Sequence, residues 1–292
     1  MSRNALRIST KRTSGRPKIK PLVDADVLLY EIGFCGEYKD EEGNHQVREW
    51  EFVRELLDQK ISDICEAVFN KEEPTLYLSA TPSLVKQWNR IYDDNLVWKP
   101  NFRIELSTKK GYKTQRKQEK PFHYHNIAAY LLGKYTCKLA IGIEADDAMA
   151  MDQRENTIIC SRDKDLRQVE GWHYSWPCGK QLAIGPMLVD KLGSISIGKG
   201  KILGTGLKFF YSQIITGDPV DNIPGLPGYG PVKAYNLLHD CNSERELYEV
   251  VQTCYKIVYG EDWEKELREQ ANLVWMVRDM NGEEPVMYEF PK

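Results

Sequence analysis

Acidic side chains gather in two short stretches of the chain, about seventeen residues apart. Glu144, Asp146 and Asp147 make up the first stretch, and Asp163 and Asp165 make up the second. Two carboxylates about 4 Å apart repel each other by on the order of 4 kcal/mol at an effective dielectric of about 20. A fold tolerates several such pairs when positive charge lies among them, and oxygen-rich sites suit Mg²⁺ or Mn²⁺. The alternative for any single Asp is a helix cap or a solvated loop position.

The elements around these acids predict that they meet at one place. Each stretch follows an apolar run typical of a buried strand, residues 137–141 and residues 157–160, and a short helix is expected over residues 148–151 between them. In such a unit both clusters lie at the same edge of a parallel sheet, beyond the carboxyl ends of its strands. Residues 21–24 predict a further strand, which ends in Asp24.

Apolar strands alternate with helical stretches along most of the chain. A helix is expected over residues 47–69, a strand over 75–79, a helix over 126–134 and an edge strand over 171–176. This alternation predicts an α/β fold with a mostly parallel central sheet flanked by helices. We expect a basic flexible arm over residues 1–20, for which a plain tail is the alternative.

Composition excludes several classes of protein. The chain has 292 residues, 41% of them hydrophobic and 28% charged, which is ordinary for a soluble globular protein. No apolar run is long enough to span a membrane, and the seven scattered cysteines lack the CxxC spacing of a zinc site and suit a reducing cytoplasm. The net charge of −3 does not exclude a nucleic-acid substrate, because lysine and arginine crowd residues 3–20 and 109–120.

A second informative stretch covers residues 217–230. Asp218 and Asp221 follow a predicted helix and could add two carboxylates to the acidic edge. Gly228 and Gly230 then precede another helix, where close backbone N–H groups and the helix N-terminus favour an anion. Helix–hairpin–helix elements hold a DNA backbone in this way, although a tight turn between two helices needs the same glycines.

Together these motifs resemble those of the 5′-nuclease (flap endonuclease) family. Gly-Ile-Glu-Ala-Asp-Asp, Ser-Arg-Asp-Lys-Asp and Gly-Asp-Pro-Val-Asp-Asn-Ile-Pro-Gly-Leu-Pro-Gly-Tyr-Gly occur in the family's order and, with the first strand, span residues 22 to about 240. The family includes the 5′-nuclease domain of bacterial DNA polymerase I and the stand-alone 5′→3′ exonucleases and RNase H of bacteriophages. The resemblance implies the PIN-like 5′-nuclease fold, with a core over 21–206 that includes a basic arch at about 82–125. It also implies a helical region over 207–292 that carries the helix–hairpin–helix motif.

The resemblance also implies roles for individual residues. Two Mg²⁺ ions, for which Mn²⁺ may substitute, would be held by the acids, and K⁺ is a further expectation at the helix–hairpin–helix turn. Tyr-Lys-x-x-Arg at the base of the arch would supply two catalytic cations. The metal ligands would be Asp24, Glu144, Asp146, Asp147, Asp163, Asp165, Asp218 and Asp221; the catalytic cations Lys113 and Arg116; and the DNA-binding residues Tyr112, Lys117, Gly228, Gly230 and Lys233.

Two positions depart from the family's pattern. Asp26 is acidic where the family usually has a small polar residue, and we interpret it as a helix cap. The second strand is followed by Ala80, where the family usually has an Asp, so the first ion site would bind metal more weakly or use a water instead.

The sequence therefore predicts a metal-dependent 5′→3′ exonuclease or 5′-flap endonuclease, a cytoplasmic monomer (in the host cytoplasm if phage-encoded) that acts in replication or repair. Its substrate would be DNA with free 5′ ends or flaps, and RNA primers paired to DNA are a second possibility. One alternative is a structure-specific DNA-binding protein with weakened or lost nuclease activity. Another is a ribonuclease of the small PIN type, against which the Gly228–Gly230 element argues.

Overall fold

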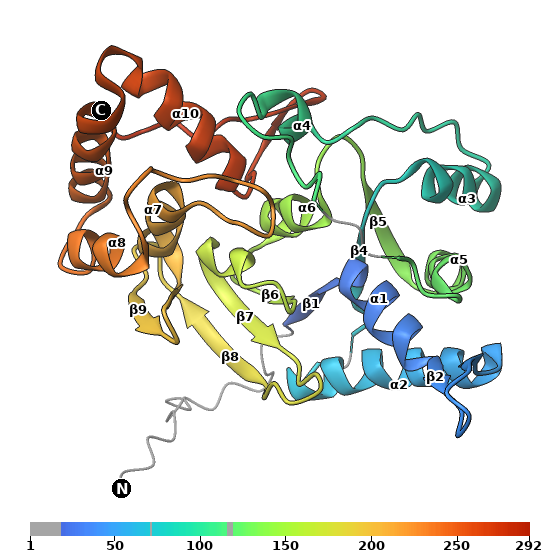
Figure 1. Cartoon of the computed structure of the whole chain (residues 1–292). Helices are drawn as coiled ribbons and strands as arrows, with labels where there is room; N and C mark the ends of the chain where they lie inside the picture. Colours follow the sequence, from blue (N-terminus) through green and yellow to red (C-terminus); the bar gives the residue numbers. More distant parts are fainter. Residues whose placement is uncertain (1–18, 71, 116–118) are drawn as a thin grey trace, which may run out of the picture.

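A six-stranded sheet forms the centre of the computed structural model, which describes residues 19–70, 72–115 and 119–292 (Figure 1). Its strand order is β5-β4-β1-β6-β7-β8; the first five strands are parallel, and β8 pairs antiparallel with β7. The strands are β1 Lys20–Asp24, β4 Thr75–Ser79, β5 Thr136–Ala140, β6 Thr157–Cys160, β7 Gly171–Ser175 and β8 Ile184–Val189. The prediction of a mostly parallel α/β sheet is confirmed.

Alternating side chains of the central strands build two cores, one on each face of the sheet. Val23 of β1 packs with helices α1, α2 and α5, whereas Leu22 packs with α6 on the other face. The same alternation separates Leu76 from Tyr77 in β4, because successive side chains of a strand point to opposite faces. These helices are α1 Ala25–Cys35, α2 Trp50–Ala67, α5 Tyr124–Lys134 and α6 Ala145–Asp152.

The C-terminal helices form a third core beside the sheet (Figure 1). Phe210, Tyr211 and Ile214 of α7 are fully buried there, and the strands β9 and β10 form a hairpin that precedes α7. The 3₁₀ helix that follows β6 contacts α7, so this helical region packs on the sheet. The elements are β9 Ile195–Gly198, β10 Lys201–Gly204, α7 Gly206–Thr216, α8 Pro231–Leu238, α9 Glu244–Tyr259, α10 Trp263–Val274 and the 3₁₀ helices Asp165–Gln168 and Gly260–Asp262.

Shorter elements fill the connections. A hairpin of β2 and β3 leads from α1 to α2, two helices lie between β4 and α5, and a last hairpin of β11 and β12 follows α10. Their bounds are β2 Glu37–Lys39, β3 His45–Val47, α3 Pro82–Tyr92, α4 Phe102–Leu106, β11 Met280–Asn281 and β12 Glu284–Pro285. Within the described ranges, no helix has both the length and the apolarity that crossing a bilayer would require.

One sequence expectation about the sheet is wrong. Residues 171–176 were expected to form an edge strand, but β7 lies inside the sheet because β8 pairs with it from Gly171 to Ser175. Residues 178–206 are rich in glycine and weakly patterned, which predicts hairpins or loops rather than a sixth strand of the main sheet.

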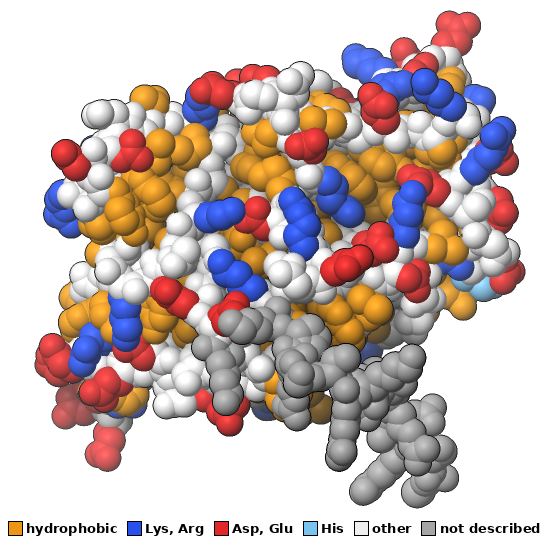
Figure 2. All heavy atoms as spheres, turned by 180° about the vertical axis from the view of Figure 1, so that it is seen from behind, with side chains coloured by type: hydrophobic (Ala, Val, Ile, Leu, Met, Phe, Trp, Pro, Cys, Tyr) orange, Lys and Arg blue, Asp and Glu red, His pale blue; other side chains and the backbone are white. Residues whose placement is uncertain are grey.

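On the face seen from behind, acidic and basic side chains are interspersed among apolar ones rather than gathered by sign (Figure 2).

Candidate metal centre

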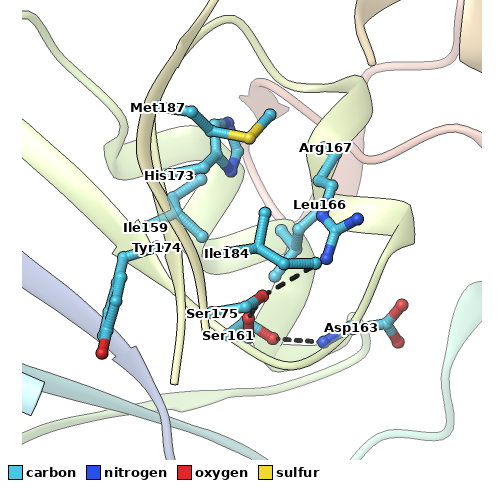
Figure 3. Close-up of a pocket in the computed structure, with 10 residues that line it drawn as sticks. All are labelled: Ile159, Ser161, Asp163, Leu166, Arg167, His173, Tyr174, Ser175, Ile184 and Met187. Atoms are coloured by element: carbon cyan, nitrogen blue, oxygen red, sulfur yellow. Dashed lines mark hydrogen bonds between the residues drawn. The ribbon is translucent and has the colours of Figure 1, made fainter. Parts of the chain in front are cut away.

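Asp24 and Asp163 are joined through one serine at the carboxyl edge of the sheet. Asp24 ends β1 and caps α1: its Oδ1 accepts a hydrogen bond from the Val27 amide at 3.2 Å, and its Oδ2 accepts one from the Ser161 hydroxyl at 2.6 Å. The Asp163 amide donates to Ser161 Oγ at 2.9 Å. In Figure 3 the carboxylate of Asp163 points away from the small pocket behind it, where Ser161 and Ser175 lie. Adjacent strands β1 and β6 therefore bring these two acids together.

Asp165 is held by three neighbours. Its amide donates to Asp163 Oδ1 at 2.8 Å, and its own Oδ1 accepts from Gln213 Nε2 of α7 at 2.7 Å. Lys164 Nζ lies 3.0 Å from Asp165 Oδ1 and 3.0 Å from Asp218 Oδ2. A lysine ammonium thus bridges two of the predicted metal ligands, which belong to segments more than fifty residues apart in the sequence.

A tight loop after α7 presents Asp218 and Asp221. Asp218 and Ile223 exchange two backbone hydrogen bonds, of 3.0 and 2.8 Å. Gly217 and Gly225 lie face to face with φ of 68° and 66°, and a Cβ on Gly225 would come within 2.4 Å of the Gly217 nitrogen. Only glycine fits both the positive φ and the close approach.

Lys113 contacts this loop through both its backbone and its side chain. The Lys113 amide donates to the Asp221 carbonyl at 3.0 Å, and its Nζ pairs with Glu144 and lies 3.7 Å from Asp221 Oδ2. The Tyr112 hydroxyl donates to Glu144 Oε2 at 3.0 Å. Lys113 therefore lies between Glu144 of the first acidic stretch and Asp221 of the loop after α7.

Asp147 lies apart from the other acids and is fully buried. Arg103 of α4 pairs with it through two parallel hydrogen bonds of 2.7 and 2.8 Å, and Asp147 also accepts from the amides of Val277 and Glu144. Arg103 is itself buried and donates to the carbonyls of Leu273 and Trp275. Because both oxygens of Asp147 are occupied in this way, we correct the sequence expectation and leave Asp147 out of the candidate ligand set. Asp146, its neighbour, lines the site.

Burial and repulsion between neighbouring carboxylates raise the pKa of four of these acids. Burial, reinforced by Asp26, raises the pKa of Asp24 to about 7, and burial together with Asp163 raises the pKa of Asp165 to about 7. Burial and the neighbouring acids, Asp24 first, raise the pKa of Asp146 well above its ordinary value, and burial raises that of Asp163. Such shifts mark a site where bound positive charge would be strongly favoured.

Glu144 and Asp218, each paired with a lysine, have the opposite pKa shift, whereas Asp165 keeps a raised pKa although Lys164 contacts it too. Burial alone would raise the pKa of Glu144, but Lys113 and Arg103 outweigh it and lower that pKa to about 2. In the same way Lys164 outweighs burial and lowers the pKa of Asp218. The two lysines therefore neutralise part of the acidic cluster.

Two adjoining pockets hold the acids. An open pocket of about 890 Å³ contains Asp24, and a nearly filled one of about 20 Å³ contains Asp165 and the loop after α7. Both are lined by Lys113, Glu144, Asp146 and Asp163. Carboxylate oxygens suit a hard divalent cation, so the donor set fits Mg²⁺ or Mn²⁺. As the side chains stand, no three His, Cys, Asp or Glu groups in the described ranges form a ready-made ligand shell, and the two lysines lie between the acids.

The predicted DNA-binding residues differ in exposure: Tyr112 is buried, whereas Gly228 and Gly230 are exposed. Tyr112 was expected to contact DNA, but its side chain is only 6% exposed and it packs in the C-terminal core, so its ring offers no free face to a base. Gly228 and Gly230 are exposed at the turn before α8, and Lys233 lies over the Tyr229 ring at 3.3 Å. Arg116 and Lys117 lie outside the described residues, as does most of the expected arm.

Three contributors escaped the sequence reasoning. Lys164 lies within the Ser-Arg-Asp-Lys-Asp motif but had no predicted role, and Arg103 lies in a segment without a motif. Asp26 was interpreted as a helix cap, but the cap of α1 is Asp24, whereas Asp26 accepts from the Ser79 amide of the neighbouring strand. The only sequence signal for these roles was unusual charge at each position.

Comparison with known proteins gives one relative in sequence. No family model matches the chain. The DNA polymerase I of Rhizobium leguminosarum is 35% identical over 108 residues, which cover 34% of this chain and 10% of that protein. This relative is of the kind that the motif resemblance names. The chain spans about a tenth of its length.

Solved structures with some likeness to the chain include nucleases. A bacteriophage T5 D15 flap endonuclease, described as a pseudo-enzyme–product complex with DNA and metal ions, is 14% identical with a TM-score of 0.46, over 88% of this chain and 99% of that one. The T5 5′-exonuclease with bound zinc is 15% identical with a TM-score of 0.47, over 88% of this chain and 100% of that one. The catalytic core of Rad2 in complex with DNA is 13% identical with a TM-score of 0.40, over 88% and 72%. All three TM-scores are below 0.5, and the fold of the chain is defined by its own strands and their register.

Proposed function

We propose that the chain is a metal-dependent 5′-nuclease, a phosphodiesterase that degrades DNA 5′→3′ or cuts 5′ flaps in replication or repair. The observation that carries this proposal is the convergence of carboxylates from four segments around Lys113 at the carboxyl edge of the sheet. Those segments are the ones in which the sequence resembles 5′-nucleases. RNA primers paired to DNA are a second substrate of the same chemistry.

The candidate ligand set divides between the two adjoining pockets. Asp24 belongs to the open pocket, Asp165, Asp218 and Asp221 belong to the filled one, and Glu144, Asp146 and Asp163 border both. When bound, two divalent ions such as Mg²⁺ or Mn²⁺ would polarise the phosphate and generate hydroxide from water. Lys113 would then face the scissile phosphate, where a preorganised cation stabilises developing negative charge.

The turn before α8 would hold the nucleic-acid backbone away from the reacting bond. The Gly228–Gly230 backbone and the N-terminus of α8 face solvent, and Lys233 adds a cation in the first turn of the helix. Such a surface contacts phosphates without reading bases. We retain K⁺ at this turn, action as a monomer and a cytoplasmic location as parts of the proposal; the seven cysteines are free thiols, which suits that compartment.

A 5′-labelled flap duplex tests the proposal. With Mg²⁺ or Mn²⁺ the protein should release the labelled flap, or the label itself in short 5′ products, and excess EDTA should stop the reaction. A matched 3′-flap duplex with blocked 5′ ends serves as the control substrate and should remain intact. Failure to cut the 5′-flap duplex with either metal would contradict the enzyme proposal.

The second candidate is a structure-specific DNA-binding protein with weakened or lost cleavage. Two observations favour it: β4 is followed by Ala80 rather than an acid, and Lys164 bridges Asp165 and Asp218. Under this alternative the same flap duplex would bind tightly and stay uncut in both metals.

A further inference from the structure

Asp26 reaches from the first turn of α1 to the end of the neighbouring strand. Both of its carboxylate oxygens lie 3.1 Å from the Ser79 amide nitrogen, at the last residue of β4. Strands β1 and β4 are adjacent and parallel, with Asp24 opposite Tyr77. The carboxylate of Asp26 therefore lies beyond the carboxyl end of β4, although its own backbone follows β1.

The end of β4 itself brings no acid. The residues after β4 are Ala80 and Thr81, whereas β1 ends in Asp24, and the segments after β5 and β6 lead to Glu144 and Asp163. Asp26 thus completes a row in which each of these four adjacent strands, β5, β4, β1 and β6, has a carboxylate at its end.

The hydrogen bond to Ser79 does not account for a charged side chain. One amide N–H is shared by two oxygens, so each oxygen keeps further acceptor capacity, and an amide or a hydroxyl would accept the same bond. Asp26 lines the open pocket together with Asp24, Glu144, Asp146 and Asp163. A fifth carboxylate among these acids adds repulsion, and among the described residues that line the pocket only Lys113 and Arg162 oppose the five, so a bound cation would offset the remainder.

We infer that Asp26 is a further metal-binding residue of the candidate centre and supplies the negative charge that β4 itself does not bring. Ser79 fixes its carboxylate at that place through the backbone hydrogen bond. The inference rests on the proposed function, since it requires a divalent cation in the pocket of Asp24.

Titration calorimetry with Mn²⁺ alone tests this on the full chain. Asp26→Asn keeps the shape and the acceptor for Ser79 but removes the charge, so the melting temperature in EDTA should not fall. Its Kd for Mn²⁺ should rise by at least about tenfold. The matched control Glu41→Gln removes one negative charge from the exposed turn between β2 and β3 and should bind Mn²⁺ like the unchanged protein.

A second variant asks whether the place of the charge matters. Asp26→Asn combined with Ala80→Asp returns a carboxylate to the end of β4 by another route, and should recover the original Kd to within about threefold. If Asp26→Asn does not fold, Asp26→Ser removes the same charge, and the same rise in the Kd for Mn²⁺ is expected of it.

The possible failures are distinguishable. If the parent protein binds Mn²⁺ and Asp26→Asn binds it equally well, the inference is overturned. Asp26 would then have only a structural role, as the acceptor for the Ser79 amide. Failure of Ala80→Asp to restore binding would also overturn it. Absence of any Mn²⁺ binding in the parent protein would instead remove the metal centre on which the proposed function depends.

Discussion

At the scale of single residues, the buried pair of Arg103 and Asp147 has the best-defined role. Its side chains are 2% and 0% exposed, and it ties α4 to α6 and to the segment after α10. A charge taken out of water is tolerated only with a partner and full hydrogen bonding. Arg103 thus supports the site from behind by fixing the first turn of α6, where Asp146 lies.

Arg103→Met should therefore destabilise the protein strongly. The substitution leaves the carboxylate of Asp147 buried without a partner, which costs about 3–5 kcal/mol of the free energy of unfolding. Urea denaturation measures this loss. The double variant Arg103→Met with Asp147→Leu should recover most of it, because the stranded charge is gone; equal losses in both variants would contradict the argument.

The raised pKa values of Asp24 and Asp165, each about 7 against an ordinary 3.8, predict how stability depends on pH. Between those values the folded chain binds more protons than the unfolded chain, so stability in EDTA should fall as pH rises from about 4 to about 7. Mg²⁺ binds the deprotonated acids, so the stabilisation it adds should grow over the same window.

Melting temperatures at pH 5, 6, 7 and 8, with EDTA and with Mg²⁺, check this dependence. Asp165→Asn cannot titrate and should show a shallower decline in EDTA. A melting temperature that climbs from pH 5 to pH 8 in EDTA would contradict the assignment of raised pKa values to these two acids.

The sequence predicted which acids gather at the sheet edge, but not which side chains contact them. Acids directly after apolar runs predicted the sheet-edge cluster, because strand ends follow from local hydrophobicity. The contact of Arg103 with Asp147 joins positions 44 residues apart, and that of Asp26 with Ser79 joins positions 53 apart. No local pattern encodes such pairs. Tyr112 was misjudged for the same reason, since its burial depends on the distant α7–α10 core.

At the scale of elements, the loop between α7 and α8 decides where two of the acids point. Gly225 has φ of 66°, and a Cβ there would lie 2.4 Å from the backbone of Thr216 and Gly217. Gly225→Ala should lose at least about 2 kcal/mol of unfolding free energy through strain and displaced backbone. It should also weaken Mn²⁺ binding, because Asp218 and Asp221 move with the loop.

Gly230→Ala is the matched control in the same loop. Its φ is −79° and a Cβ there would meet no atom within 4 Å, so the cost should stay below about 1 kcal/mol. Chemical denaturation and Mn²⁺ calorimetry compare the two variants. Equal effects would show that the close approach of Gly217 and Gly225 does not hold the loop.

The strands and helices themselves were predicted well, whereas their order in space was not. Apolar runs located β1, β4, β5 and β6, yet β5 and β6 are separated in the sheet by β4 and β1. Strand order depends on long-range pairing that a single sequence leaves open. β8 was not located because Gly185 and Pro186 interrupt its apolar residues, and glycine and proline are typical of turns.

At the scale of the whole molecule, the candidate centre is shared between the sheet and the C-terminal helices. The sheet brings Asp24, Glu144, Asp146, Asp163 and Asp165, and the loop after α7 brings Asp218 and Asp221. Two hydrogen bonds join these parts, one from Gln213 of α7 to Asp165 and one from the Lys113 amide to the Asp221 carbonyl. Packing of the helical region on the sheet is therefore a condition for the metal centre that we propose.

The central claim, a metal-dependent nuclease centred on these acids, is tested most directly by Asp163→Asn on a 5′-flap duplex in Mg²⁺. The variant keeps the oxygen that accepts from the Asp165 amide, so the fold should persist. Asp93→Asn, at an exposed left-handed position after α3 that suits asparagine equally, is the control. The account predicts that Asp163→Asn cuts at least about 100-fold more slowly than both the parent and the control, while its Kd for the duplex stays within about threefold. Cleavage at the parent rate by Asp163→Asn would contradict it.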